Sequence, residues 1–113
     1  MGTFAVEGGR HLEGRIRPAG NKNAALPCLA ATLLSQSPVT LRNVPRIRDV
    51  LTFLDILIAL GSEVSWIGKN DLIIDTGGVK TSSVERELAA RIRASLLLAG
   101  PLLTRFGKVE LPP

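Results

Sequence analysis

A lysine–asparagine pair, Lys22-Asn23, lies where a turn rich in Gly, Pro and Asn meets an apolar segment. The run reads Pro18-Ala-Gly-Asn-Lys-Asn-Ala-Ala-Leu-Pro27, and its second half is typical of a helix start. Backbone N–H groups at a helix start have no intrahelical acceptor and lie at the positive end of the helix dipole. Because an adjacent ammonium adds charge to such a site, this placement favours an anionic ligand.

The same two residues have a simpler interpretation on chemistry alone. Lys22 would then be a solvated lysine beside an asparagine that caps the helix. Asn23 can serve as an N-cap or can bind a ligand oxygen or hydroxyl, because its amide both donates and accepts hydrogen bonds. The residues alone leave both interpretations open.

Other reactive side chains do not form a recognisable constellation. His11 stands alone in a predicted hairpin and is expected to be exposed, and Ser95 has no recognisable base. Cys28 lies in an apolar stretch, where a buried, unreactive thiol is expected. We therefore expect no metal and no cofactor.

Composition narrows the class of protein. The 113 residues are 45% hydrophobic, 21% charged and 4% aromatic, which is typical of one small folded domain. The net charge is +4, but the basic residues are scattered and tyrosine is absent, so we expect no nucleic-acid partner. No apolar run approaches the length of about 18 residues that a membrane span requires, so we expect no membrane partner and a cytoplasmic location.

Periodicity predicts a mixed α and β fold. Apolar residues alternate on both sides of Gly8-Gly9, which predicts a strand hairpin within residues 1–20. Residues 23–35 are apolar on nearly every side and predict a buried helix, with Pro27 close to its start. Residues 39–41 predict a short strand.

The middle of the chain carries the clearest helical pattern. A helix that ends at Gly61 is predicted to bury a stripe at helical spacing, followed by strands at 64–66 and 72–74 around a turn at 68–71. The stripe consists of Ile47, Val50, Leu51, Leu54 and Ile58.

The last third predicts a surface loop, a third helix over about 85–99 and a final strand. Gly100-Pro101 is expected to perturb or end that helix. Its buried stripe is predicted to be Val84, Leu88, Ile92, Leu96 and Ala99.

Three blocks of sequence resemble one family in the same order. They are Gly20-Asn-Lys-Asn-Ala-Ala-Leu-Pro27 with Leu29-Ala-Ala-Thr-Leu-Leu34, then Asn43-Val-Pro-Arg-Ile-Arg-Asp-Val50, then Arg93-Ala-Ser-Leu-Leu-Leu-Ala-Gly-Pro-Leu102. Together they resemble the N-terminal portion of the UDP-N-acetylglucosamine enolpyruvyl transferases, or 1-carboxyvinyltransferases, of the EPSP synthase superfamily. The resemblance covers essentially the whole chain.

The resemblance implies an α/β (α+β) fold of the kind called an inside-out α/β barrel. Each domain of that fold repeats a β-α-β-α-β-β unit with helices inside and sheets outside. Here we expect about one unit plus an initial strand, a third helix and a final strand. Residues 1–20 would form a hairpin and interdomain region, 21–76 the first unit, and 77–113 the truncated start of the second.

The resemblance also implies an activity. Such an enzyme transfers the enolpyruvyl group of phosphoenolpyruvate to the 3-hydroxyl of UDP-N-acetylglucosamine and releases phosphate. This is the first committed step of peptidoglycan synthesis, and thus serves cell-wall biogenesis and cell shape. The implied partners are the two substrates and the remainder of the two-domain enzyme.

Site residues carry over by alignment with the family motifs. Lys22 is implied as a catalytic residue that binds phosphoenolpyruvate, Asn23 as a ligand of phosphoenolpyruvate and the sugar, and Arg93 as a ligand of UDP-N-acetylglucosamine. Without the resemblance, Arg93 would be a solvated helix arginine. Arg91 has a weaker claim. Structural or solvent roles are expected for Arg46, Arg48 and Arg105.

Two other functions remain as alternatives. The sister 3-phosphoshikimate enolpyruvyl transferases share the architecture but usually have serines after the equivalent lysine, where this chain has Asn23-Ala-Ala. A non-catalytic ligand-binding module of the same fold is the other alternative. Because the family's general acid lies beyond residue 113, we expect an N-terminal portion that is inactive alone.

Overall fold

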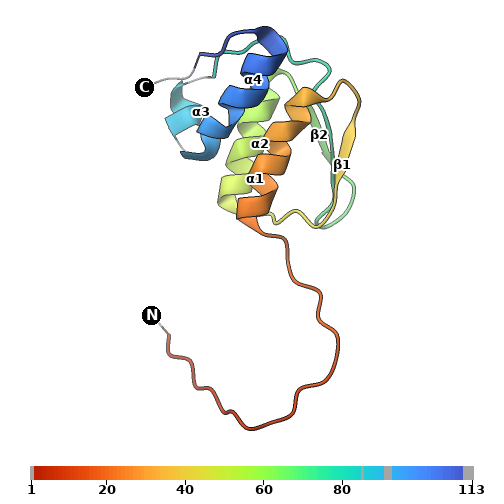
Figure 1. Cartoon of the computed structure of the whole chain (residues 1–113), viewed down its shortest axis with the longest axis vertical. Helices are drawn as coiled ribbons and strands as arrows, with labels where there is room; N and C mark the ends of the chain where they lie inside the picture. Colours follow the sequence, from red (N-terminus) through yellow and green to blue (C-terminus); the bar gives the residue numbers. More distant parts are fainter. Residues whose placement is uncertain (1, 85, 91–92, 111–113) are drawn as a thin grey trace.

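The folded body of the protein is built on two long helices and a three-stranded sheet, with shorter helical segments from residues 86–106 packed beside them. The computed structural model describes the backbone at residues 2–84, 86–90 and 93–110, and the side chains of these residues except 88, 89 and 93–95. Helices α1 and α2 lie side by side against the sheet, and residues 2–20 extend away from it (Figure 1). In the described part of the chain, no helix is both long and apolar enough to cross a bilayer.

Helix α1 (Lys22–Ala31) continues into a 3-10 turn, η1 (Thr32–Leu34), and both lie within the predicted helix at 23–35. Pro27 is inside α1, later than the predicted position near its start. Because proline has no N–H, it removes the donor that would bond to the carbonyl of Asn23.

The sheet consists of β1 (Val39–Leu41), β2 (Glu63–Trp66) and β3 (Leu72–Asp75), in the order β1-β3-β2. Both outer strands are antiparallel to β3 and hence parallel to each other. The chain passes from β1 through α2 to β2, so this segment is a split β-α-β crossover with β3 between its strands. The three predicted strands of this region are confirmed.

One face of the sheet packs against the helices. The pairing register places alternate residues of each strand on that face, where they join the hydrophobic core. They are Val39, Leu41, Val64, Trp66, Leu72 and Ile74. The other face carries exposed or half-buried residues such as Thr40, Ser65 and Ile73. The sheet is therefore covered on one face only by the described helices.

Helix α2 (Arg48–Leu60) confirms the predicted amphipathic helix and ends at Gly61, whose left-handed φ of 117° favours glycine. Its buried face is rotated from the predicted stripe. Val50 and Leu54 are buried as expected, but Phe53 and Leu57 complete the core face. The predicted Ile47, Leu51 and Ile58 are between 41% and 50% exposed, because the sheet and neighbouring helices contact α2 on the Phe53 side.

The third predicted helix is divided into shorter pieces. These are α3 (Arg86–Ala90), the 3-10 helix η2 (Arg93–Leu98) and α4 (Ala99–Phe106). Gly100-Pro101 changes the helix type without ending the helix, because both residues lie in the first turn of α4, where a missing N–H costs little. Up to residue 110, where the described chain ends, the predicted final strand is represented by one parallel bridge between Ser83 and Glu110.

The buried stripe predicted for the third helix is only partly correct. Val84 is buried and Ala99 half-buried, but Leu96 is 71% exposed, because η2 does not keep the 3.6-residue period on which the stripe was based. The side chain of Leu88 and all of Ile92 lie outside the described residues.

The predicted N-terminal hairpin is absent. Residues 2–20 contain no strand, and the apolar side chains meant for it, such as Phe4 and Ile16, are more than 90% exposed. Alternation alone does not form a strand, because a strand also needs a paired neighbour and a covered face. His11 is exposed, as predicted.

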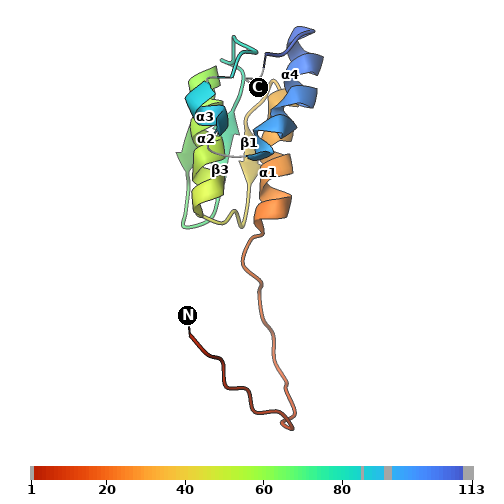
Figure 2. The same ribbon diagram turned by 90° about the vertical axis from the view of Figure 1, so that its left-hand side faces the viewer.

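One side of α1 is also uncovered, in contrast to the predicted buried helix. Ala25, Leu26, Leu29, Ala30 and Leu33 face the core. On the other side Cys28, predicted to be buried, is exposed, and so is Leu34 in the following turn η1, at 54%. An apolar side becomes buried only where a second layer covers it, and the described residues cover α1 on one side (Figure 2).

Candidate functional site

The helices α1 and α2 begin at the same end of the folded body. They run in the same direction, because the chain returns along β1 before α2 starts (Figures 1 and 2). The first turns of both helices therefore lie next to each other, with the free N–H groups of each pointing toward the same end.

The first turn of α1 is capped by Asn21. The Asn21 Oδ1 atom accepts a hydrogen bond of 2.6 Å from the backbone N–H of Asn23, and the Asn21 carbonyl accepts from Ala25 at 2.9 Å. The N-cap interpretation of Asn23 is therefore wrong, since Asn23 is the second residue of the helix. The first turn of α1 contains no acidic residue.

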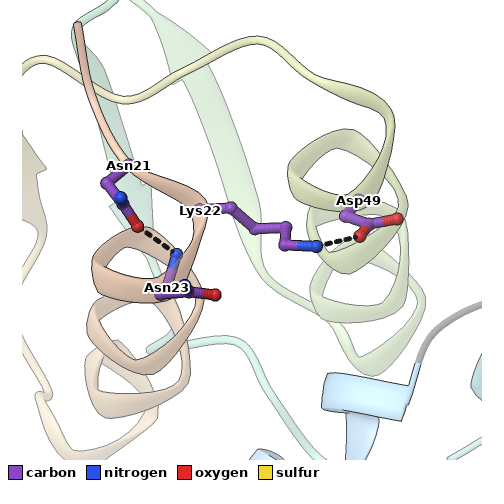
Figure 3. A network of polar contacts seen from close by, with 4 residues as sticks. All are labelled: Asn21, Lys22, Asn23 and Asp49. Atoms are coloured by element: carbon purple, nitrogen blue, oxygen red, sulfur yellow. Dashed lines mark hydrogen bonds and ion pairs between the residues drawn. The ribbon is translucent and has the colours of Figure 1, made fainter.

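Lys22 reaches from α1 to α2. Its Nζ atom donates to Oδ2 of Asp49 at 3.0 Å, and Asp49 lies in the first turn of α2 (Figure 3). The side chains of Lys22 and Asp49 are 44% and 38% exposed. Lys22 is therefore held in an ion pair that remains open to water, and the solvated-lysine interpretation does not describe it.

Asn23 follows Lys22 on the same turn (Figure 3). It is exposed, and its side-chain amide forms no hydrogen bond with any residue that the structure describes. Its donors and acceptor thus face solvent beside the Lys22 ammonium, where they can bind a small polar ligand.

Close backbone packing sets the relative position of the two helix starts. A Cβ atom on Gly20 would clash with the carbonyl oxygen of Asn43 and lie 2.7 Å from Cδ of Pro45. Asn43 has a left-handed φ of 57°, and its Nδ2 atom donates to the carbonyl of Pro18 at 3.1 Å. The segment before α1 therefore contacts the segment before α2 directly.

The turn between β2 and β3 fixes the segment before α2. Val44 exchanges two hydrogen bonds with Asn70: its N–H donates to the Asn70 carbonyl at 2.7 Å and its carbonyl accepts from Asn70 Nδ2 at 3.0 Å. The Asn43 N–H donates to Oδ1 of Asp71 at 3.1 Å. The start of α2 is thus anchored to the sheet.

Arg46 strengthens the same anchor. It donates to the carbonyls of Lys69 and Gly68 at 2.7 and 2.9 Å, and its guanidinium lies 4.0 Å from the ring centroid of Trp66. The predicted structural role of Arg46 is confirmed.

The other two arginines also agree with their predicted roles. Arg105 donates to the carbonyl of Leu33 and to Thr76 Oγ1, each at 3.1 Å, and so connects α4 to η1 and the end of β3. Arg48 is exposed.

A cavity of about 280 Å³ lies on another side of α1, between this helix and the segment leading to α2. It is lined by Ala19, Gly20, Asn21, Ala24, Ala25, Cys28, Leu41, Arg42, Asn43 and Val44. Lys22 and Asn23 do not line it, and both residues are exposed. Across the described residues, no three His, Cys, Asp or Glu side chains group as metal ligands would.

Comparison with known proteins places this arrangement in a family. The family described as EPSP synthase (3-phosphoshikimate 1-carboxyvinyltransferase) matches residues 6–112. The chain belongs to the EPSP synthase family. The fold agrees: the enolpyruvyl transferase NikO from Streptomyces tendae superposes with a TM-score of 0.73 at 28% identity, over 88% of this chain and 23% of that one.

Curated relatives within the EPSP synthase family are more similar in sequence. UDP-N-acetylglucosamine 1-carboxyvinyltransferase from Bradyrhizobium diazoefficiens is 51% identical over 97% of this chain. The enzyme of the same name from Treponema denticola is 48% identical over 100% of it. In both cases 26% of the relative is covered, so the chain spans about a quarter of the length of the relatives it matches.

Lys22 and Asn23 lie in the same turn of α1, but the side chain of the third predicted site residue, Arg93, is not described. Arg93 is the first residue of η2, which packs against α1, and its side chain lies outside the described part of the chain. Arg91 lies outside the described residues altogether.

Three residues that build this end of the molecule were not predicted from the sequence: Asp49, Gly20 and Asn43. A signal for them was present. Each of the two helices follows a turn rich in Gly, Pro or Asn, and a strand lies between the helices. Helices separated by one strand run in the same direction, so a cation opening one helix and an acid opening the other come close together.

Proposed function

We propose that this chain forms the phosphoenolpyruvate-binding part of a UDP-N-acetylglucosamine 1-carboxyvinyltransferase. The enzyme transfers the enolpyruvyl group of phosphoenolpyruvate to the 3-hydroxyl of UDP-N-acetylglucosamine and releases phosphate. One observation carries the proposal: the Lys22 ammonium stands at an open helix start that has no acid in its own first turn.

Electrostatics at this end of α1 support an anionic substrate. The unpaired N–H groups of the first turn and the Lys22 ammonium give positive potential at one place. Asp49 contacts the ammonium through one oxygen, and the ammonium has three donors. A phosphate or carboxylate oxygen therefore finds donors at Lys22 while the contact with Asp49 persists.

The proposed chemistry explains why such donors are needed. A proton adds to C3 of phosphoenolpyruvate and the sugar hydroxyl adds to C2, which gives a tetrahedral intermediate. Loss of phosphate from C2 and of a proton from C3 then restores the double bond. Lys22 binds phosphate and carboxylate oxygens through these changes, because a flexible ammonium can follow their movement.

Two further residues complete the proposed site. The Asn23 amide orients a phosphoenolpyruvate oxygen or a sugar hydroxyl from the next position of α1. Arg93 binds the UDP-sugar, for which a planar guanidinium offers paired donors to diphosphate oxygens. No cofactor takes part in this scheme.

The names of the curated relatives favour the UDP-sugar as acceptor. The exposed apolar side of α1 favours a chain that packs against more protein over a stand-alone module. The remainder of a two-domain enzyme is its proposed partner, and the proposed setting is the first committed step of peptidoglycan synthesis in the cytoplasm.

The test uses the product of the native gene at its natural length. Its intact mass is measured first, and phosphate release from phosphoenolpyruvate is then followed with each acceptor. Release with UDP-N-acetylglucosamine supports the proposal. Release with shikimate 3-phosphate alone would assign the sister activity, and no release with either would reject the transferase and leave the binding module.

A further inference from the structure

We propose that Asp49 is a positioning residue for Lys22, which holds the ammonium at the start of α1 where the anionic substrate binds. This inference rests on the proposed function and extends it to the second helix. Asp49 itself does not contact the substrate in this scheme.

The geometry of the contact carries the inference. The Lys22 Nζ atom and Asp49 Oδ2 are 3.0 Å apart, and the residues are 27 positions apart in sequence. Lysine has a long, flexible side chain, and a fixed acceptor restricts it to few conformations. A restricted ammonium loses less entropy when it binds a substrate oxygen, which strengthens binding and aligns the reacting group.

The surroundings of Asp49 suit this role better than a role in stability. With both side chains more than one-third exposed, the ion pair is screened by water and contributes little to folding. Asp49 lies in the first turn of α2, which has no side-chain cap. The free N–H groups and the helix dipole there attract its carboxylate. The position of α2 is fixed in turn by the contacts of Asn43, Val44 and Arg46 with the β2–β3 turn.

The experiment compares Asp49→Ala with Asp49→Asn in the natural-length gene product. Asp55→Ala is the matched control, because Asp55 is exposed on the same helix and forms no ion pair with a described residue. We expect Asp49→Ala to lower kcat/KM for phosphoenolpyruvate about 10-fold and to leave KM for UDP-N-acetylglucosamine within about twofold. Asp49→Asn keeps an oxygen acceptor at the same place, so a smaller loss is expected.

A spectroscopic signature separates positioning from a general structural defect. In protein with 13C-labelled lysine, relaxation of the Lys22 Cε group reports its motion relative to the exposed Lys69. We expect Lys22 to be the more restricted of the two, and to approach the mobility of Lys69 in Asp49→Ala only.

Three outcomes would overturn the inference: unchanged Lys22 relaxation in Asp49→Ala, unchanged kcat/KM for phosphoenolpyruvate, or the same loss when Lys22 is already replaced by Gln. If the wild-type protein releases no phosphate, the proposed function fails by itself. The relaxation measurement then still decides whether Asp49 restrains Lys22.

Discussion

The two helix starts at the site end of the molecule differ in how each satisfies its first turn. Helix α1 has a side-chain cap, Asn21, and no acid in its first turn, and it places a lysine there. Helix α2 has no side-chain cap and carries an acid, Asp49, in its first turn. The two helix starts therefore carry opposite charges, and the Lys22–Asp49 ion pair connects them.

This difference indicates which start is available to a ligand. At α2 the carboxylate of Asp49 already lies in the positive field of the helix, whereas at α1 the lysine adds to that field. Neutral capping by Asn21 satisfies an N–H group without adding negative charge. Of the two helix starts, the start of α1 is therefore the one that attracts an anion.

Among changes to the two helix starts, removing the Lys22 cation should have the largest effect, and this effect should be on activity. Lys22→Gln leaves α1 capped but removes the ammonium that we propose binds the substrate oxygens. We expect kcat/KM for phosphoenolpyruvate to fall about 100- to 1000-fold in steady-state assays of the natural-length protein. Lys69→Gln, at an exposed position in the β2–β3 turn, is the control, and an equal loss there would contradict a specific role for Lys22.

Separating the two helix starts should have the next largest effect. Gly20→Ala places a methyl group against the Asn43 carbonyl and Pro45, so the segments before α1 and α2 must move apart. We expect the free energy of unfolding to fall by about 1–3 kcal/mol in urea denaturation. Gly8→Ala is the control, since nothing lies within 4 Å of its added methyl group, and it should be neutral.

Changing the cap of α1 should have a smaller effect. Asn21→Ala removes the acceptor for the Asn23 N–H and should cost about 1 kcal/mol in thermal unfolding. Asn21→Asp keeps that acceptor and the stability, but adds negative charge beside Lys22. We therefore expect weaker phosphoenolpyruvate binding by calorimetry in Asn21→Asp, and tighter binding would contradict the proposed anion site.

The smallest effect should come from making α2 resemble α1. Ile47 is the N-cap residue of α2, forms no side-chain cap and is 42% exposed. Ile47→Ser supplies a hydroxyl acceptor and should be about 0.5–1 kcal/mol more stable than Ile47→Ala in urea denaturation, because the Ala variant controls for the lost side chain. Equal stability of the two variants would show that no cap forms.

Local sequence patterns predicted the elements of residues 22–76 well. Helix α2, the three strands and the Gly61 terminus follow from hydrophobic spacing and turn residues, which act over a few positions. The surroundings of these elements were predicted less well. Cys28 and Leu96 are exposed, because burial depends on which layers cover a helix and a single helix sequence does not determine that.

In the candidate site, too, local features were predicted and contacts between distant segments were not. Lys22 and Asn23 were predicted from a turn followed by an apolar helix, which is a local pattern. Asp49 was missed because its contact with Lys22 depends on the direction of two helices and on the close approach of Gly20 to Asn43. Such contacts arise from topology, which local patterns leave undetermined.

The exposed thiol of Cys28 gives this chain a natural attachment point for a fluorescent label. Cys28 is the one cysteine among the 113 residues and lies six positions after Lys22 on the same helix, about 9 Å along its axis. This side of α1 is the one that we propose packs against more protein in the natural-length enzyme. The rate at which a thiol-reactive dye couples to Cys28 would therefore report whether that cover is in place.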